Sequence, residues 1–307
     1  MGLRIAVLGL GAWGQTLQER WQAQGHHVVG WSRRSGGTAI GLLADQDLVV
    51  SAVAMAGVLP LAVELAPHWP AGLPLLSCSK GLDMLQLATP TQLWGAHVPL
   101  APLLVLSGPN LATEVQQGLP AASVLACRDP QLASAMQREL SDRGLRLYTN
   151  TDPIGTEAAG ALKNVMAVAA GISDGLSLGA NAKASLLCRG LAEIGVVLEG
   201  LGGRTSTLYG LAGLGDLLAT ASSSLSRNYR CGLLLAQGHN EAQAYGQIAA
   251  TVEGTRTARA ALQLAGRHGW HLPICEQVVR VLDGAITPDE AVRALMERGL
   301  RPEAGSQ

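Results

Sequence analysis

The sequence predicts an α/β fold, in which a doubly wound, mostly parallel sheet is followed by an all-helical second domain. Two observations predict this fold. Near the N-terminus, an apolar strand pattern at residues 3–8 runs into the glycine-rich sequence GLGAWG and then into a helical pattern at residues 15–24. From about residue 152 onward, strand-like alternation gives way to successive helical patterns separated by glycines. We therefore expect a domain boundary near residue 150.

The glycines of the first turn form a GxGxxG pattern made of Gly9, Gly11 and Gly14. In such a turn the first glycine allows the tight bend, the second lets a pyrophosphate approach the backbone, and the third lets helix and strand pack closely. The helix that follows presents free N–H groups to the phosphates. A glycine-rich turn without a ligand is the alternative, but the position between strand and helix favours a Rossmann-type dinucleotide site.

The second predicted strand, residues 27–31, ends in Ser32, Arg33 and Arg34. A site for NAD usually carries an acidic residue here to bind the ribose 2′-hydroxyl, whereas two arginines suit a 2′-phosphate. The alternative is a solvated basic turn. We expect NADP(H) to be preferred as cofactor, with NAD(H) also possible.

The rest of the first half continues the alternation of strands and helices. The segment before the third strand, residues 35–46, is short and leaves room for only about three turns of helix. Strands are expected at residues 47–54, 73–78, 103–106, 121–126 and 145–149, and helices at 57–66, 111–117 and 130–140.

Two turns at the carboxyl ends of these strands carry candidate site residues, since strand ends in such sheets face the ligand crevice. Lys80 follows the fourth strand in the sequence SCSKGL and is expected to point at cofactor or substrate. A surface lysine that begins a loop is the alternative. Gly108 and Asn110 lie in the SGPN turn after the fifth strand, where backbone N–H groups at a helix start could meet an anion.

The second half is organised around Lys163, which lies inside the apolar run 158–172. Lysine is rare in a helix buried on most of its circumference unless a partner or a reaction requires it. Burial disfavours the ammonium form and moves the pKa toward the range needed for proton transfer near neutrality. The alternatives are a lysine that snorkels from a helix end, or a structural pair with Glu157 or Asp174.

Two further stretches of the second half carry polar chemistry. Asp216 follows a glycine turn at the start of an apolar helix, residues 217–221, and a helix cap is the alternative. Residues 222–230 are dense in hydroxyl, amide and guanidinium donors and precede the helical run 231–237, which suits an anion pocket. A polar surface loop capped by serine is the alternative there. Breaks between helices are expected at glycines 202–203, 213–215, 238 and 254.

Composition and spacing exclude several classes of protein. The net charge of −1 indicates no preference for nucleic acid or membrane surfaces. No stretch offers about 20 unbroken apolar residues, so no membrane insertion is expected, and the strand-like start argues against a signal peptide. The five cysteines contain no CxxC and are expected to be reduced thiols, while the histidines show no ligand spacing, so no metal is expected. Residues 301–307 are expected to be disordered.

The motifs occur in one order along the chain: GLGAWG, SKGL, SGPNLATEV, ALKNVMAVAAGISDGLSLGANAKA, CRGLAE, GLAGLGD, SRNYRCG and VEGTRTA. This order resembles the bacterial NAD(P)-dependent glycerol-3-phosphate dehydrogenases over essentially the whole chain. The resemblance implies a cytoplasmic enzyme that interconverts dihydroxyacetone phosphate and sn-glycerol 3-phosphate for phospholipid synthesis. It also implies a dinucleotide-binding domain over residues 1–150 and a helical substrate-binding and catalytic domain over residues 151–307. The apolar faces of the helical domain favour a homodimer.

The resemblance also implies roles for individual residues. Lys163 matches the general acid/base, Lys80 contacts both substrate and cofactor, and Asp216 matches a partner of the substrate or of the lysine. The substrate-binding residues implied are Lys80, Gly108, Asn110, Lys163, Asp216, Ser226, Arg227 and Asn228. The cofactor contacts expected are Gly9, Gly11, Ala12, Trp13, Gly14, Arg33, Arg34, Lys80, Ala112, Arg227 and Glu253.

Three features depart from the family pattern. Asn110 stands where the family usually has Ser or Thr, Ala54 replaces the usual proline after the third strand, and the segment 35–46 is shorter than normal. The rival interpretations are a related two-domain reductase of a small keto or hydroxy acid, of the ketopantoate type, and a non-catalytic NADP(H)-binding protein. A donor-rich stretch suited to a phosphate argues against the first, and a buried lysine beside such a stretch argues against the second.

Overall fold

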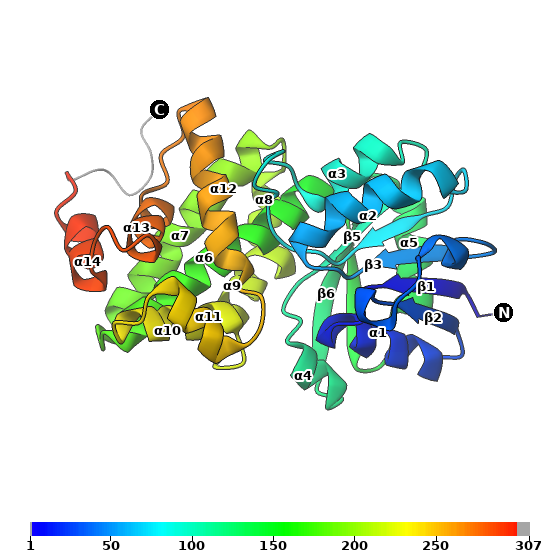
Figure 1. The fold of residues 1–307 in the computed structure, drawn as a ribbon, viewed down its shortest axis with the longest axis horizontal. Helices are drawn as coiled ribbons and strands as arrows, with labels where there is room; N and C mark the ends of the chain where they lie inside the picture. The colour runs from blue at the N-terminus through cyan, green and yellow to red at the C-terminus, as the bar shows by residue number, and fades with distance from the viewer. Residues whose placement is uncertain (1, 300–307) are drawn as a thin grey trace.

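The computed structural model describes residues 2–299, so the disorder expected at residues 301–307 lies outside the described residues. Figure 1 shows two parts side by side: a sheet flanked by helices, and a cluster of helices built from the second half of the chain. The sheet part ends with a strand at Leu145–Asn150, and the helical part begins at Pro153. The predicted fold class is confirmed.

Within residues 2–299 the sheet has seven strands in the order β2-β1-β3-β4-β5-β6-β7. Their bounds are β1 Arg4–Leu8, β2 His27–Trp31, β3 Leu48–Ser51, β4 Leu75–Ser77, β5 Leu103–Ser107, β6 Ala121–Cys127 and β7 Leu145–Asn150. All neighbours pair in parallel except β5 and β6, which pair antiparallel. The chain order reverses at β1, between β2 and β3, and in such sheets the crevice at the reversal binds ligands.

Helices cover both faces of the sheet, which makes it doubly wound (Figure 1). On one face, α1 (Ala12–Ala23) and α5 (Pro130–Leu140) bury Leu17 and Leu140 against the strands. On the other face, α2 (Val58–Leu65) and α3 (Pro90–His97) bury Leu61 and Trp94. The short helix α4 (Ala112–Gln116) follows β5. Helix α3 has no counterpart among the sequence predictions, because its initial proline and short length hide the helical period.

The segment after β2 contains no α-helix. It forms two single 3₁₀ turns, Arg33–Ser35 and Ile40–Leu42. Gly36 and Gly37 separate these turns, and both have φ of +72°, a backbone conformation that a right-handed helix excludes. The room predicted for about three turns of helix is therefore used by a looped connection.

The helical part is built around α6 (Pro153–Gly175), which is buried at almost every position up to Ser173. Asp152 caps its start, because the Oδ1 atom of Asp152 accepts a hydrogen bond of 2.9 Å from the N–H of Gly155. The helices that follow are α7 Gly179–Gly200, α8 Thr205–Leu208, α9 Asp216–Ala221, α10 Arg227–Ala236, α11 Glu241–Ile248, α12 Glu253–His268, α13 Pro273–Leu282 and α14 Pro288–Met296.

The predicted breaks between these helices are correct at glycines 202–203 and 238, which lie in loops. The glycines at 213–215 belong to a π-helical turn, Leu211–Gly215, that leads directly into α9. The prediction for Gly254 is wrong, because this residue lies in the first turn of α12. An added Cβ at Gly254 would lie 2.5 Å from the carbonyl oxygen of Asn164, so the glycine serves close packing of α12 on α6.

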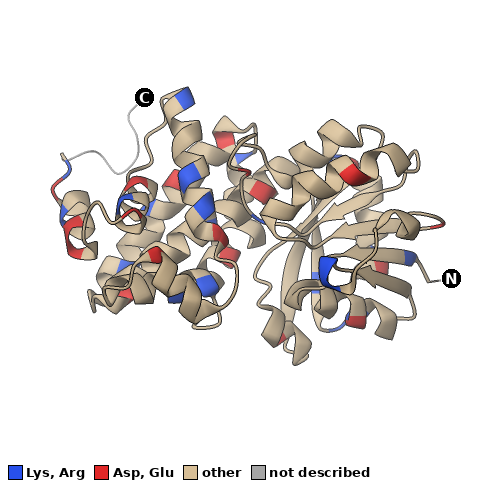
Figure 2. Ribbon diagram, viewed as in Figure 1, with Lys and Arg blue, Asp and Glu red and all other residues tan. Residues whose placement is uncertain are grey.

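Positively and negatively charged residues are intermixed along the described part of the chain (Figure 2). Figure 2 shows lysines and arginines interspersed with acidic residues over the helices, and few charged residues on the strands. Within residues 2–299 no helix combines the length and the apolar character that crossing a bilayer requires.

Helices α6 and α10 approach closely where glycines face each other. An added Cβ at Gly232 would lie 2.0 Å from the carbonyl oxygen of Val168 and 2.9 Å from the Cα of Gly171. Backbone atoms cannot give way as a flexible side chain can, so the crossing requires glycine at this position. The approach lets α10 bury one of its faces against the central helix.

We expect Gly232→Ala to lower the free energy of unfolding, measured in urea, by about 1–3 kcal/mol, the usual cost of overpacking. The matched control is Gly266→Ala in α12, where an added Cβ meets nothing within 4 Å. That control should raise the free energy of unfolding by about 0.4–1 kcal/mol, because alanine restricts the unfolded chain. A Gly232→Ala protein as stable as the parent would contradict the close crossing.

Candidate active site

One carboxylate binds two lysines at the junction of the sheet and the helical part. The Oδ1 atom of Asp216 accepts a hydrogen bond of 2.6 Å from Nζ of Lys163, and its Oδ2 atom accepts one of 2.6 Å from Nζ of Lys80. The side chain of Asp216 is 1% exposed, that of Lys163 8% and that of Lys80 20%. The three predicted catalytic residues, distant in sequence, are therefore in contact.

Each of the three comes from a different element. Lys163 lies in the middle of α6, Lys80 follows β4, and Asp216 is the first residue of α9. Lys80 also donates a hydrogen bond of 3.1 Å to the carbonyl oxygen of Gly108, in the turn after β5. The ends of β4 and β5 and the helical part thus meet at this carboxylate, as expected for ligand-facing strand ends.

The structural alternatives for these residues are contradicted. The carboxylate of Glu157 binds Thr91, and that of Asp174 binds Lys183 and Tyr229, so neither pairs with Lys163. Asp216 is no helix cap, because the N-cap of α9 is Gly215 and no side chain caps that end.

The electrostatics of the cluster favour a lysine that titrates near neutrality. Burial lowers the pKa of Lys163 to about 8; the negative charge of Asp216 opposes this shift and the positive charge of Lys80 adds to it. Burial acts to raise the pKa of Asp216, but the two lysines outweigh it and the pKa lies below its usual value. Asp216 is therefore ionised at neutral pH beside a lysine that can both give and take a proton.

Thr220 is a member of the cluster that the sequence prediction missed. Its hydroxyl accepts a hydrogen bond of 2.6 Å from Nζ of Lys163 and donates one of 3.2 Å to Oδ1 of Asp216. The available signal was its spacing, since a residue four positions after Asp216 lies on the same face of a helix. Thr220 fixes the direction in which the lysine points.

The turn after β5 contributes Gly108 and Asn110. Gly108 has φ of +148°, and an added Cβ would lie 2.9 Å from the Cα of Ser123, so only glycine fits there. The Oδ1 atom of Asn110 accepts a hydrogen bond from the hydroxyl of Ser123. Its Nδ2 atom is buried and has no hydrogen-bond partner in the described part of the chain. Asn110 therefore offers a donor that a ligand can satisfy.

The three residues at the start of α10 differ in exposure and in bonding. The hydroxyl of Ser226, which is buried, caps α10 by accepting a hydrogen bond from the N–H of Tyr229, so this helix begins four residues before the predicted run 231–237. Arg227 is exposed at the first position of the helix. Asn228 is buried; it donates 2.9 Å to the side-chain oxygen of Asn164 and accepts 2.9 Å from the N–H of Gly254. Asn228 thus joins α10 to α6 and α12, and Asn164 is a further residue that the sequence prediction missed.

The glycine-rich turn fits a dinucleotide. Gly11 is the N-cap of α1 without a side-chain cap, and an added Cβ there would meet nothing within 4 Å, so the space in front of it is open. Gly9 has φ of +103°, and an added Cβ at Gly14 would lie 1.9 Å from the carbonyl oxygen of Gly9. Ala12 and Trp13 form the first turn of α1, whose N–H groups face this open space.

The remaining cofactor candidates lie around the same crevice. Arg33 and Arg34 are exposed in the 3₁₀ turn directly after β2, capped by Ser32. Ala112 begins α4, on the side of α1. Glu253 lies at the first position of α12, and its Oε1 atom accepts a hydrogen bond of 3.3 Å from the N–H of Met55, beyond the end of β3. Burial raises the pKa of Glu253, while the charges of Arg256 and Arg227 act against this.

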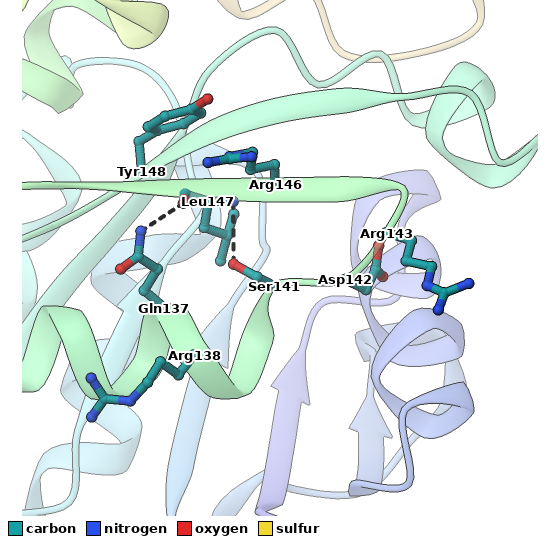
Figure 3. Close-up of a pocket in the computed structure, with 8 residues that line it drawn as sticks. All are labelled: Gln137, Arg138, Ser141, Asp142, Arg143, Arg146, Leu147 and Tyr148. Atoms are coloured by element: carbon teal, nitrogen blue, oxygen red, sulfur yellow. Dashed lines mark hydrogen bonds between the residues drawn. The ribbon is translucent and has the colours of Figure 1, made fainter.

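A surface hollow of about 460 Å³ lies elsewhere, between α5 and β7 (Figure 3). Its lining contains none of the predicted site residues: it is formed by Gln137, Arg138, Ser141, Asp142, Arg143, Arg146, Leu147 and Tyr148. Figure 3 shows Gln137 and Ser141 directed at the backbone of Leu147; Gln137 donates 2.8 Å to its carbonyl and Ser141 accepts from its N–H. These bonds occupy the free edge of the sheet.

Within residues 2–299 no group of three or more His, Cys, Asp or Glu side chains could bind a metal ion.

The comparisons with known proteins cover nearly the whole chain. The family model described as NAD-dependent glycerol-3-phosphate dehydrogenase N-terminus matches residues 40–133, and the corresponding C-terminus model matches residues 152–293. The glycerol-3-phosphate dehydrogenase [NAD(P)+] of Synechococcus sp. (strain RCC307) is 55% identical, over 99% of this chain and 100% of the relative. The one from Synechococcus sp. (strain JA-2-3B'a(2-13)) is 51% identical, over 97% of this chain and 95% of the relative. The crystal structure of glycerol-3-phosphate dehydrogenase from Coxiella burnetii has a TM-score of 0.91 and 32% identity, covering 97% of this chain and 99% of that one.

Asp216→Asn should lower the pKa of Lys163 below about 8, because the attraction of the carboxylate is lost while burial and the charge of Lys80 remain. Titration of ¹³Cε-labelled lysines by NMR, with Lys163→Arg to assign the resonance, measures this value. The matched control is Asp174→Asn. Asp174 lies on α6, as Lys163 does, but its carboxylate pairs with Lys183. An unchanged or raised pKa in Asp216→Asn would contradict the electrostatic account.

Proposed function

The chain belongs to the NAD-dependent glycerol-3-phosphate dehydrogenase family, and on that premise we propose that it reduces dihydroxyacetone phosphate to sn-glycerol 3-phosphate with NAD(P)H. The observation that carries the mechanism is the buried Lys163, paired with Asp216 and opposite the ends of β4 and β5. A carbonyl that becomes an alcohol needs one proton, and a lysine with a pKa of about 8 can supply it near neutrality.

Lys163 acts as the general acid in the reduction. A nicotinamide cofactor, when bound, would supply the hydride that the reduction needs. Nζ of Lys163 donates its proton to the carbonyl oxygen of the substrate as negative charge develops there. In the reverse direction the neutral amine of Lys163 removes the proton from the hydroxyl group. Asp216 and Thr220 orient the amine through hydrogen bonds of 2.6 Å each.

Lys80 stabilises the negative charge that develops on the same oxygen. Its ammonium lies on the other oxygen of Asp216 and on the carbonyl of Gly108, so it is fixed before the substrate arrives. A positive charge aimed at developing negative charge is worth most when it is preorganised in a site with little water. The Nδ2 atom of Asn110, which has no partner among the described residues, donates to an oxygen of the substrate. At this position the family usually has the hydroxyl of Ser or Thr.

The phosphate end of the substrate binds at the start of α10. Arg227 supplies an exposed guanidinium at the helix N-terminus, where the helix dipole also favours an anion. Ser226 and Asn228 contribute to this end mainly by fixing the start of α10, because their side chains are engaged within the protein. Gly108 lets the backbone approach the substrate.

The cofactor binds across the carboxyl ends of the strands, at the reversal of strand order. Gly9, Gly11 and Gly14, with the N–H groups of Ala12 and Trp13, accommodate its pyrophosphate. We propose that NADPH is preferred over NADH, since Arg33 and Arg34 suit a 2′-phosphate. Ala112, Arg227, Glu253 and Lys80 are the other residues that we propose to contact the cofactor.

Several wider properties follow from the family and the fold. We propose a boundary near residue 150, with a dinucleotide-binding domain over residues 1–150 and a substrate domain over residues 151–307. The enzyme acts in the cytoplasm and supplies the backbone for phospholipid synthesis. Exposed apolar side chains on the helical part, among them Leu178, Val196 and Tyr209, support a homodimer.

The assay follows NADPH absorbance with dihydroxyacetone phosphate, in parallel with ketopantoate and with NADH. We expect turnover with dihydroxyacetone phosphate and none with ketopantoate. We also expect a lower KM for NADPH than for NADH. Turnover with ketopantoate instead would favour the keto-acid reductase, and cofactor binding without any turnover would favour a non-catalytic protein. The identity of 55% over the whole chain supports the first outcome.

Lys163→Met should lower kcat by about 10²–10⁴-fold, the usual contribution of general acid/base catalysis, while NADPH still binds. The matched control is Lys183→Met, which removes another lysine of the helical part that pairs with Asp174. The control should keep the parent kcat. Near-normal turnover in Lys163→Met would remove Lys163 from the catalytic role.

A further inference from the structure

Besides Asp216 on α9, a second carboxylate is buried, that of Glu157 on α6, and it contacts the sheet part of the molecule. Its Oε1 atom accepts a hydrogen bond of 2.9 Å from the N–H of Thr91, and its Oε2 atom accepts one from the hydroxyl of Thr91. Thr91 lies in the first turn of α3, on the face of the sheet covered by α2 and α3. Glu157 is 3% exposed and takes no part in the mechanism above.

This contact completes the start of α3. The first residue of α3 is Pro90, which has no N–H, so the N–H of Thr91 is the first that needs an acceptor outside the helix. A carboxylate at that end satisfies the donor and interacts favourably with the helix dipole. Gln92 within α3 already accepts from the N–H of Thr89, and the carboxylate of Glu157 adds an acceptor from α6 that joins the two parts of the molecule.

One turn further along α6, a second contact joins the same two parts. An added Cβ at Gly160 would lie 2.6 Å from the hydroxyl oxygen of Ser107 and 3.8 Å from Cδ of Lys80. Helix α6 thus lies directly on the end of β5, beside the side chain of Lys80. Lys163 follows three residues later, about 9 Å along the helix axis from Glu157.

The geometry of the catalytic cluster depends on how α6 sits against the sheet. Lys163 and its partners Asp216 and Thr220 belong to the helical part, whereas Lys80 and Gly108 belong to the strand ends. Because α6 is one unbroken helix from Pro153 to Gly175, a shift at Glu157 moves Lys163 with it. The contact of 2.6 Å between Lys80 and Asp216 spans the same boundary.

We propose that Glu157 is a positioning residue, which fixes α6 against α3 and so sets the placement of Lys163 and Asp216 relative to Lys80 and the substrate. This inference rests on the proposed function and deepens it by assigning a role to a residue outside the catalytic cluster. Misplacement by about 1 Å can reduce turnover by about 10²-fold.

The helical part contains a matched control. Glu193 on α7 is 6% exposed, and its carboxylate accepts hydrogen bonds of 2.6 Å and 3.2 Å from the N–H groups of Ile274 and Cys275, at the start of α13. It is the same kind of cap, with a proline at the start of the capped helix, but both partners lie within the helical part. Its loss should affect stability without moving α6 against the sheet.

The experiment compares Glu157→Leu, Glu157→Gln and Glu193→Leu by kcat, KM for dihydroxyacetone phosphate, NADPH affinity and Tm. We expect Glu157→Leu to lose about 10²-fold in kcat with unchanged NADPH affinity. In Glu157→Gln the side-chain oxygen can still accept from the N–H of Thr91 and the amide can donate to the hydroxyl of Thr91, so this variant should restore most of the turnover. Glu193→Leu should lower Tm but keep the parent kcat.

A crystal structure of Glu157→Leu gives a readout that is independent of activity, namely a distance between Nζ of Lys80 and Oδ2 of Asp216 longer than 2.6 Å. Should Glu157→Leu fail to fold, Thr91→Val removes only the hydroxyl donor and should lower kcat in the same direction by less. Parent kcat in the folded variant, an unchanged distance, or an equal loss in Glu193→Leu overturns the inference. Absence of turnover in the parent protein with dihydroxyacetone phosphate would instead refute the proposed function, while the distance still tests the positioning role.

Discussion

The carboxylate of Asp216 is the interaction on which the rest of the site depends. Without this carboxylate, the two neighbouring ammonium groups of Lys80 and Lys163 would repel each other. A buried lysine without a partner would also cost free energy of folding. Each oxygen of Asp216 accepts a hydrogen bond from one lysine, so the two ammonium groups share one negative charge and both side chains have a fixed direction. The result is a lysine whose pKa of about 8 reflects burial more than pairing.

The fold supplies this arrangement through close backbone approaches. The central helix α6 can carry a lysine in a buried setting because glycines let its neighbours pack tightly against it, at Gly160 toward β5 and at Gly171 toward α10. The chain has 38 glycines and no phenylalanine, so its helices pack through small and aliphatic side chains at short separation. Such packing transmits small displacements, which is why a cap at Glu157, remote from the chemistry, bears on the placement of Lys163.

Much of the fold could be predicted from the sequence, because local patterns specify it. The period of the apolar residues identified the strands and several of the helices, and GxGxxG identified the first turn between strand and helix. Helix α3 escaped prediction because two turns beginning at a proline show no clear period. Gly254 was interpreted as a break, although it lies inside α12, because a glycine needed for close packing looks the same in sequence as one that ends a helix.

The sequence by itself determined the fold class, the glycine-rich turn between β1 and α1 and the candidates Lys80, Lys163 and Asp216, since each follows from residue type and local position. Only the tertiary structure decided which carboxylate pairs with Lys163. Glu157 and Asp174 are nearer in sequence, yet each is engaged elsewhere, and the partner comes from another helix. The physical reason is that the pKa and the direction of a buried lysine depend on charges and burial contributed by distant segments, which no local pattern encodes.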